Sequence, residues 1–223
     1  MVGATLNNCI VYSNTAAGEA NFTSDTTLNF TCTTPQPAAG IGNITNTPVF
    51  VDLVGGNLRL QSNSPCINSG FNAYAPAGSD LDGNPRISRD TVDVGAYEFQ
   101  SPASVLSYAW AQQNGLPTDG SADFTDADGD GMSNYGEWRS DTNPTNSLSS
   151  LRMVNATNSP TGADVTWQSV STRNYWLERA TNLAVASPFQ TIATNIAGVA
   201  GLKTFTDTSA TNAGPYFYRV GVQ

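Results

Sequence analysis

Histidine is absent from this chain of 223 residues. Its absence excludes Ser-His-Asp and Cys-His catalysis and every metal site that is built on imidazole ligands. Basic residues are scarce as well, because Lys203 is the only lysine and the formal net charge is −9. A chain with no basic stripe to neutralise phosphates is expected to bind neither nucleic acid nor an anionic membrane surface.

Long apolar runs are also missing from the sequence. No segment approaches the roughly 20 apolar residues that span a bilayer, so membrane insertion is not expected. Met1 is not followed by a basic stretch and an apolar core, so no signal peptide is visible. The chain opens instead with residues typical of the middle of a fold, and we expect the natural protein to extend further upstream.

Cysteine is limited to Cys9, Cys32 and Cys66. An odd number leaves at least one thiol over, and the spacing lacks the CxxC pairs that zinc sites use. The simplest interpretation is that all three are small buried apolar residues. Stacked strands about 4.8 Å apart would also allow a Cys9–Cys32 or a Cys32–Cys66 disulfide, and the sequence does not choose between them.

Residues 1–100 contain short β-prone runs separated by Gly, Pro, Asn and Asp turns, with no helical period. Cys9 and Cys32 lie 23 residues apart, and a repeat of this length with one or two short strands per turn is typical of a solenoid. The runs expected to contain strands are 7–14, 28–35, 47–52, 57–61 and 93–99.

Residues 101–148 have a different character. The run "SPASVLSYAWAQQNGLP" predicts a short helix with Ser104 as its N-cap and with Gly115 and Pro117 at its end. An acidic loop follows, and a second short helical turn is expected around residues 133–138.

Residues 149–223 return to alternating apolar and polar residues, with a turn about every ten residues, which is typical of a small antiparallel sandwich. The predicted class is therefore all-β, in three parts: residues 1–100 as coils of a parallel β-helix, 101–148 as a helical calcium-binding linker and 149–223 as a sandwich. The strands expected in the last part are 163–170, 174–180, 189–196, 202–209 and 215–222.

The acidic loop "DADGDGMSNYGE" matches the calcium-loop pattern D-x-[DN]-x-[DN]-G-x5-E at every constrained position. Its glycine falls at the sharp turn, its asparagine falls where a water can mediate, and its glutamate closes the loop as a bidentate ligand. The competing interpretation is a solvated acidic loop, but carboxylates this close repel one another without a counter-ion. The predicted calcium ligands are Asp126, Asp128, Asp130, the backbone carbonyl of Met132, Asn134 and Glu137.

Four more oxygen-bearing residues flank the loop, namely Asp119, Asp123, Asp141 and Asn143. They would either complete this site or form a second metal site, although their spacing matches no fixed pattern.

A second stretch, "DLDGNPRISRDT" at residues 80–91, opens in the same way as the acidic loop. It carries Pro85 where the pattern needs glycine and Thr91 where the pattern needs glutamate, so calcium is not expected there. We interpret it as a turn in which Asp80 and Asp82 cap backbone amides and pair with Arg86 or Arg89.

Three segments resemble known families. Residues 43–99, "GNITNTPVFVD…LRLQSNSPCINSG…DLDGNPRI…TVDVGAYEF", resemble the closing segment of bacterial secreted right-handed parallel β-helix proteins of the choice-of-anchor type. Residues 119–147, "DxDxDGMSNYxEW…TNPTN", are similar to thrombospondin type 3 and dockerin calcium loops. The resemblance implies that the matching Asp and Glu residues ligate calcium. One loop instead of the two of a dockerin makes cohesin an unexpected partner.

The third resemblance is that of residues 149–223 to a fibronectin type III domain, with Tyr216 or Tyr218 placed like a tyrosine corner. Together the resemblances imply a non-catalytic, calcium-stabilised module of a secreted or cell-surface protein, with a structural, adhesive or glycan-associated role. The expected partner is a polysaccharide or a component of the cell envelope, and the oligomeric state stays open.

Two alternatives involve polysaccharides more directly. β-helix proteins often act as polysaccharide lyases or glycoside hydrolases, and Asp80, Asp90 and Asp93 are the carboxylates that such an enzyme would use. We interpret them as turn and cap residues and assign no catalytic residue. The other alternative is a carbohydrate-binding module, for which Trp176 is the best candidate because it would point away from its buried neighbours Tyr175 and Leu177.

Overall fold

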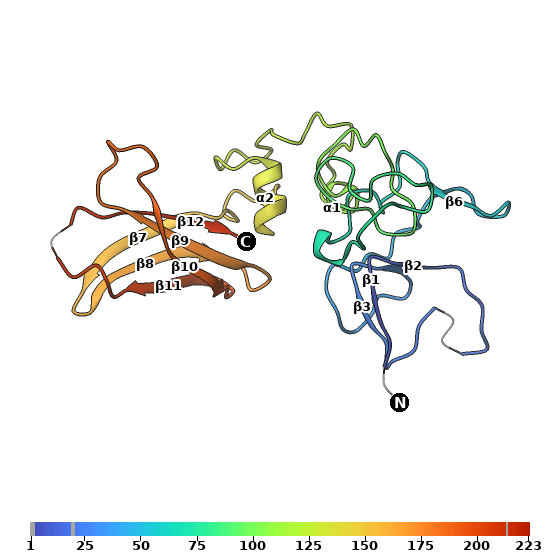
Figure 1. The fold of residues 1–223 in the computed structure, drawn as a ribbon, viewed down its shortest axis with the longest axis horizontal. Coiled ribbons are helices and arrows are strands. Elements are labelled where there is room, and N and C mark those ends of the chain that lie inside the picture. The colour runs from blue at the N-terminus through green and yellow to red at the C-terminus, as the bar shows by residue number, and fades with distance from the viewer. Residues whose placement is uncertain (1–2, 19–20, 213) are drawn as a thin grey trace. The chain divides into compact units, whose positions relative to one another are not determined.

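The computed structural model describes residues 3–18, 21–212 and 214–223. It divides the chain into two compact units, an N-terminal unit of residues 1–125 and a C-terminal unit of residues 126–223. Strands hold 29% of the residues and helices 7%, which confirms the all-β class (Figure 1). The expected linker, residues 101–148, is shared between the two units.

The N-terminal unit begins with two pairs of parallel strands. β1 (Thr5–Asn7) pairs with β3 (Thr27–Asn29), and β2 (Ile10–Val11) pairs with β4 (Cys32–Thr33). Ile10 lies opposite Cys32, so the offset is 22 residues and not the 23 that the cysteine spacing suggests. Because a shift of one residue moves a side chain to the other face of a strand, Cys9 does not lie opposite Cys32.

Consecutive turns of the chain are held in register by side chains as well as by the backbone. The Asn29 amide donates to the Asn7 side-chain oxygen at 3.0 Å. A third segment joins through a parallel bridge between Cys32 and Ile44, where the Thr33 amide donates to the Ile44 carbonyl at 2.9 Å. Parallel pairing of neighbouring turns satisfies the backbone of each turn with that of the next.

The remaining elements of the N-terminal unit close one hydrophobic core. β5 (Phe50–Asp52) and β6 (Asn57–Leu60) form an antiparallel pair, and a 3₁₀ turn, η1, spans Asn72–Tyr74. α1 (Tyr108–Gln113) places the ring of Tyr108 into the core. The other buried members of this core are Cys32, Leu60, Cys66, Ile67 and Val94.

The N-cap of α1 differs from the prediction. Ser107 is the cap, because its hydroxyl accepts a hydrogen bond from the Trp110 amide at 3.3 Å. Ser104 instead donates its hydroxyl to the Asp123 carboxylate at 2.6 Å. The helix therefore starts one turn later than expected, because a distant carboxylate holds the serine that the local pattern favours.

Two of the three cysteines are buried, as the simplest interpretation predicts. Cys32 and Cys66 are fully buried in the same core, and all three thiols are free in the structure. A hydrogen bond to the Cys32 side chain, followed by burial, raises the pKa of Cys66 well above its usual value. Cys9 is half-buried, and its thiol donates to the Asn7 carbonyl at 3.1 Å.

One run that was expected to be a strand, residues 93–99, forms a turn. The Asp93 amide donates to the Glu98 carboxylate at 3.0 Å, and the Phe99 amide donates to the Asp93 carboxylate at 2.7 Å. Gly95 has a φ of 122°, which only glycine adopts without strain. Side-chain acceptors thus take the backbone donors that a neighbouring strand would otherwise pair with.

The C-terminal unit contains two three-stranded antiparallel sheets. The first has the order β11-β8-β7, formed by Gly201–Asp207, Gly162–Ser169 and Met153–Ser159. The second has the order β10-β9-β12, formed by Gln190–Ala197, Asn174–Ala180 and Phe217–Val222. β7 was not among the expected strands, and the other five lie within two residues of their predicted starts.

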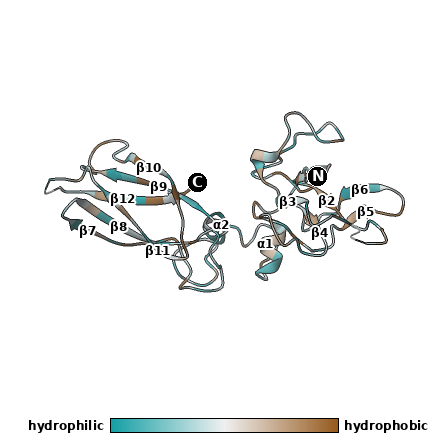
Figure 2. Cartoon of the chain, turned by 90° about the horizontal axis from the view of Figure 1, so that it is seen from below, coloured by the Kyte–Doolittle hydropathy of each residue, from teal (hydrophilic) through white to brown (hydrophobic). Residues whose placement is uncertain are grey.

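Both sheets contribute side chains to one core. Trp167 of β8 and Tyr175 of β9 are buried, with ring centroids 5.7 Å apart in an edge-on arrangement. Val165, Leu177 and Ile196 complete the buried set. Figure 2 shows hydrophilic and hydrophobic residues mixed along these strands. Within the described ranges, no helix has the length and apolar character that a membrane crossing requires.

An ion pair with a buried carboxylate ties the two sheets of the C-terminal unit together. Arg179 of β9 contacts the Asp207 carboxylate of β11 at 2.7 Å, and the Tyr218 hydroxyl of β12 donates to the same carboxylate at 3.0 Å. Burial, followed by the hydrogen bond to Asp207, raises the pKa of Tyr218 to about 12. The tyrosine therefore stays protonated and continues to donate at any physiological pH.

Candidate metal centre

The acidic loop folds so that three carboxylates converge. Oxygens of Asp126, Asp128 and Asp130 lie within 4.8 Å of one another. The Asp126 carboxylate organises the turn, because it accepts the Gly129 and Gly131 amides at 2.8 Å each. Gly131 has a φ of 94°, so the glycine at the sharp-turn position is required by the backbone, as the sequence pattern predicts.

A short helix supplies the second half of the site. α2 (Asn134–Ser140) begins after Ser133, whose hydroxyl accepts the Gly136 amide at 3.3 Å. Asn134 and Glu137 are three residues apart in the helix and therefore share a face, and both are completely buried. Met132, expected to offer its carbonyl, lies in the preceding turn, where its amide donates to Asp130 at 2.8 Å.

Several carboxylate oxygens of the loop have no donor. One oxygen each of Asp128 and Asp130 and both oxygens of Glu137 are buried and lack a hydrogen-bond partner among the described residues. A buried carboxylate without a donor or counter-charge costs several kcal/mol, so such groups are normally paired or bound to a metal. These oxygens fit a hard cation, which prefers carboxylate ligands.

The electrostatics of the loop agree with this geometry. Burial and then the nearby charges of Asp128, Asp130 and Asp126 raise the pKa of Glu137 to about 7. The Gly131 amide is the main cause that lowers the pKa of Asp126. The Glu137 carboxylate lies outside the 4.8 Å group of three, so the site consists of a tight aspartate cluster with a fourth carboxylate beside it.

The C-terminal end of α2 is fixed to the strands of the same unit. Arg173, in the turn between β8 and β9, donates to the Arg139 carbonyl at 2.9 Å and to the Trp138 carbonyl at 3.4 Å. Asp141 follows the helix in a left-handed conformation, and its carboxylate lies 3.9 Å from the Arg173 guanidinium. A cation at the end of a helix binds the free carbonyls and suits the helix dipole.

Two aromatic rings also lie on α2. The ring centroids of Tyr135 and Trp138 are 5.8 Å apart, in a tilted arrangement. Each ring is one residue from a predicted ligand, since Tyr135 follows Asn134 and Trp138 follows Glu137.

The four flanking residues all have other partners. Asp119 accepts the Ser121 amide and hydroxyl, and Asp123 is buried beneath Ser104 and Val105. Both belong to the N-terminal unit, whereas Asp141 and Asn143 belong to the C-terminal unit. Asn143 accepts the Thr145 amide at 3.0 Å. A second metal site at these residues stays a prediction. The structure engages Asp119 and Asn143 in local turns, and it pairs Asp123 and Asp141 with residues that are distant in the sequence.

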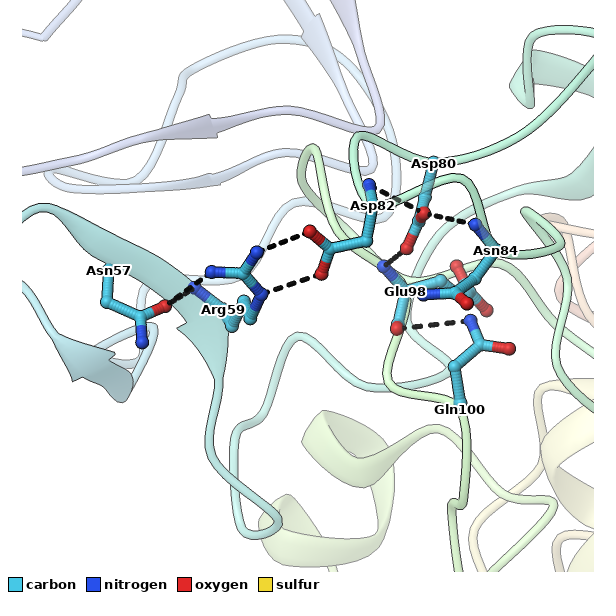
Figure 3. Close-up of polar contacts among 7 residues, drawn as sticks. All are labelled: Asn57, Arg59, Asp80, Asp82, Asn84, Glu98 and Gln100. Atoms are coloured by element: carbon cyan, nitrogen blue, oxygen red, sulfur yellow. Dashed lines mark hydrogen bonds and ion pairs between the residues drawn. The ribbon is translucent and has the colours of Figure 1, made fainter.

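The similar stretch at residues 80–91 is organised differently (Figure 3). The Asp80 carboxylate accepts three backbone amides, those of Asp82, Asn84 and Glu98, at 2.8 to 3.0 Å. Asp82 pairs with Arg59, whose Nε donates to it at 2.6 Å. The expected pairing with Arg86 or Arg89 is therefore wrong, because these arginines donate to the backbone carbonyls of Gly95, Ala96 and Ala103.

A buried carboxylate pair near this turn was predicted only in part, because Asp93 was expected to be a turn and cap residue and Glu98 was not expected to be a functional residue. Asp93 and Glu98 are 1% and 5% exposed. Burial raises the pKa of Asp93 to about 7, and burial together with the Asp93 charge raises that of Glu98 to about 8. All four oxygens of the pair accept backbone amides, from Asn68, Ser88, Asp93 and Phe99. Nothing in the local sequence distinguishes these carboxylates from exposed turn residues.

Trp176 is half-buried between the fully buried neighbours Tyr175 and Leu177. Its indole lies across Gly221 of the adjacent strand β12, so closely that a Cβ at that glycine would come within 2.1 Å of the ring. The Arg219 guanidinium lies 5.8 Å from the ring centroid. One face of the indole is thus covered by backbone, and a glycan contact through the rest stays a prediction.

Comparison with known proteins finds no matching family model, no matching curated protein and no matching solved structure.

Proposed function

We propose that residues 126–137 bind a calcium ion and that this ion stabilises the C-terminal unit. The observation that carries the proposal is the set of buried oxygens of Asp128, Asp130 and Glu137 that have no hydrogen-bond donor among the described residues. A divalent cation would offset two of the four negative charges and give the buried oxygens of Asp128, Asp130 and Glu137 the partner that they lack.

Calcium is favoured over other metals by the chemistry of the ligands. The chain has no histidine, and its cysteines lie in the N-terminal unit, so the imidazole and thiolate ligands of zinc and copper are absent from the loop. Calcium takes six to eight oxygens in flexible geometry, which suits side chains from both a turn and a helix. Magnesium needs a stricter octahedron and usually retains several waters.

The wider proposal is a non-catalytic, calcium-stabilised module of an extracellular or cell-surface protein, with a structural, adhesive or glycan-associated role. In-register parallel pairing with a 22-residue offset supports a parallel β-helix end for the N-terminal unit. Two three-stranded sheets around one core support a sandwich like that of fibronectin type III for the C-terminal unit.

The anchoring of α2 indicates which part of the protein calcium is expected to stabilise. Because Arg173 holds the end of α2 against the turn between β8 and β9, order gained at the loop passes to the strands of the C-terminal unit. We infer that the ion acts as a stabiliser of that unit, and the same contacts would let loss of the ion loosen it.

The enzyme alternative has its best candidates in Asp93 and Glu98. Their raised pKa values are typical of general acids in polysaccharide-acting enzymes. Both are almost fully buried, and backbone amides occupy their oxygens, so neither can reach a glycosidic bond without rearrangement. A capping role in the turn explains the same contacts.

The test is thermal unfolding of the whole chain with calcium and with chelator. Calcium should raise the melting temperature of the C-terminal unit by roughly 10 °C or more, as expected for a ligand far above its Kd. Glu137→Gln should lose most of this gain and should melt higher than the wild type in chelator, because it removes a buried charge.

Asp164→Asn is the matched control. Asp164 is a carboxylate of the same unit that accepts the Thr206 hydroxyl and lies outside the loop, so its calcium response should equal that of the wild type. If calcium and chelator give the same melting curve for the wild type, the loop does not bind calcium.

A further inference from the structure

We propose that the N-terminal unit binds a neutral oligosaccharide in a groove between α1 and the segment of residues 36–46. The groove has a volume of about 370 Å³. It lies within the N-terminal unit, so it is separate from the calcium loop, and the inference does not depend on calcium binding.

The lining of the groove is polar but carries no charge. Two of its lining residues, Ile44 and Ala109, are apolar, and the polar remainder consists of amides and one hydroxyl: Gln36, Asn43, Thr45, Asn46, Gln112 and Gln113. The groove shares the composition of the chain, in which only 12% of the residues are charged, and it offers polar groups that do not ionise. Pockets for apolar small molecules are lined mainly by hydrophobic and aromatic side chains, so this groove suits a different class of ligand.

Amide side chains match the chemistry of sugar hydroxyls. Each Asn or Gln offers two N–H donors and a carbonyl acceptor, and each sugar hydroxyl is both a donor and an acceptor. Neighbouring hydroxyls of one sugar ring can therefore bond both ends of one amide. An acidic glycan would need the basic residues that this lining lacks, because carboxylates and sulfates are bound by Arg or Lys.

Two amides of the lining are already fixed in place. The Asn43 amide donates to the Leu28 carbonyl at 2.7 Å, and its oxygen accepts the Thr31 amide at 3.0 Å. The Gln112 amide donates to the Asn63 carbonyl at 3.1 Å. Each fixed oxygen retains a lone pair for a ligand, and fixed groups lose little entropy when a ligand binds.

The other polar groups of the lining are available. The side chains of Gln36, Thr45, Asn46 and Gln113 are exposed and have no hydrogen-bond partner in the part of the chain that the structure describes. They come from two rigid supports, since Ile44 pairs with the parallel strands and Gln113 ends α1. The fixed amides pre-organise part of the site, and the exposed side chains beside them can adjust to a bound ligand.

A peptide is a less suitable occupant than a glycan. Peptides bind to proteins by adding a strand to a sheet edge or by placing apolar side chains in a pocket. The segment of residues 36–46 offers only one bridge residue, Ile44, to its neighbours, and the lining contains no deep apolar pocket. The structure therefore favours a ligand that is recognised through hydroxyls.

The experiment is affinity electrophoresis of the full chain through native gels that contain a soluble polysaccharide. The neutral probes are galactomannan, xyloglucan and mixed-linkage β-glucan, and polygalacturonate is the acidic probe. We expect retardation by at least one neutral polysaccharide and none by polygalacturonate, in calcium and in chelator alike. Asn46→Ala and Gln113→Ala should each weaken the binding about fivefold, the usual effect of losing one hydrogen bond.

Both substitutions are designed to leave the fold intact. Neither side chain bonds to the rest of the described structure, and alanine is the best helix former for the position in α1. Gln190→Ala, an exposed amide of the C-terminal unit, is the matched control and should bind as the wild type does.

Three outcomes would overturn the proposal. The first is that no neutral polysaccharide retards the wild type, and the second is that Asn46→Ala and Gln113→Ala bind as tightly as Gln190→Ala. The third is retardation that a casein digest abolishes and neutral oligosaccharides do not, which would identify a peptide as the ligand. If the groove binds sugar but calcium does not change the melting curve, the oligosaccharide proposal is supported and the calcium proposal fails.

Discussion

The two units each contain an acidic turn, at residues 80–91 and at residues 126–137. The two turns begin with similar sequences, but their carboxylates have different partners. In the N-terminal unit, Asp80 satisfies its oxygens with backbone amides, and Asp82 has a cation within the protein, the guanidinium of Arg59. In the C-terminal unit, Asp128 and Asp130 each keep a buried oxygen with no donor in the described ranges. The difference predicts a metal at the turn whose buried carboxylate oxygens have neither a backbone amide nor a cation of the chain as a partner.

The ion pairs of the protein explain why the acidic loop of the C-terminal unit is the unusual one of the two turns. Among the described residues, the ion pairs are Arg59–Asp82, Arg173–Asp141, Arg179–Asp207 and Arg219–Glu178, and none involves the loop carboxylates. Four carboxylates without an internal cation are expected to repel one another and destabilise the folded unit, and a bound divalent cation would reduce this repulsion. The following predictions test this comparison.

The largest expected difference between the units is their response to calcium. Millimolar calcium at a site of micromolar affinity stabilises the folded C-terminal unit by about 4 kcal/mol, and the N-terminal unit gains nothing. Hydrogen exchange in calcium and in chelator should show protection gained in residues 126–140 and in the turn that contains Arg173. Equal gains in both units would contradict the contrast between them.

The second prediction concerns pH, and here the N-terminal unit is the one that is expected to respond. The raised pKa values of Asp93 and Glu98, about 7 and about 8, mean that the folded N-terminal unit keeps protons that the unfolded chain releases near pH 4. Its free energy of unfolding is therefore highest at about pH 4 and falls by several kcal/mol as the pH rises to about 8.

Urea unfolding of the N-terminal unit between pH 4 and pH 8 measures this slope. The charged groups closest to the pair are Asp80, whose carboxylate accepts the Glu98 amide, and Arg86, whose charge lowers both pKa values. Asp93→Asn should flatten the slope, because it removes one titrating group of the pair. A stability that rises with pH would show that the amide donors dominate and that both carboxylates are charged.

The third prediction concerns the contact between α2 and the strands. Arg173→Ala removes two hydrogen bonds to the last carbonyls of the helix and should destabilise the C-terminal unit by about 1 to 2 kcal/mol. It should also lower the calcium affinity several-fold, because α2 carries Glu137. Isothermal titration calorimetry measures the affinity, and Arg152→Ala, an exposed arginine of the same unit, is the control.

The smallest effect is expected where the protein provides its own cation. Arg59→Ala should lower the melting temperature of the N-terminal unit by less than about 2 °C, because exposed ion pairs contribute little. It should not create a calcium response, since backbone amides still hold Asp80. A calcium-dependent shift in this variant would show that Arg59 alone distinguishes the two turns.

The candidate site was largely predictable because its information is local. Within twelve residues the pattern fixes the turn glycine Gly131 and the start of α2, and the structure brings Asp126, Asp128 and Asp130 together. The strands of the C-terminal unit were also predictable from alternation, except β7. Five of its seven residues are exposed, so this strand has no buried face to leave an alternating pattern.

What escaped prediction depends on residues that are distant in sequence. Ser104 does not cap α1, because its hydroxyl donates to Asp123. Arg59 pairs with Asp82, which lies 23 residues away in the sequence. The turn at residues 93–99 has β-forming residues, but its carboxylates take the backbone donors. Propensity describes what a segment prefers alone, and these contacts are decided by which segments the fold brings together.

The ring pair on α2 has a consequence for spectroscopy. Trp138 follows Glu137 directly, and its ring centroid is 5.8 Å from that of Tyr135. An ion that reorders this helix will change the emission of the indole, and a lanthanide bound in place of calcium will receive excitation energy from it. The helix that carries Glu137 therefore has an indole next to a predicted ligand, so binding of an ion is expected to be visible in fluorescence without any label.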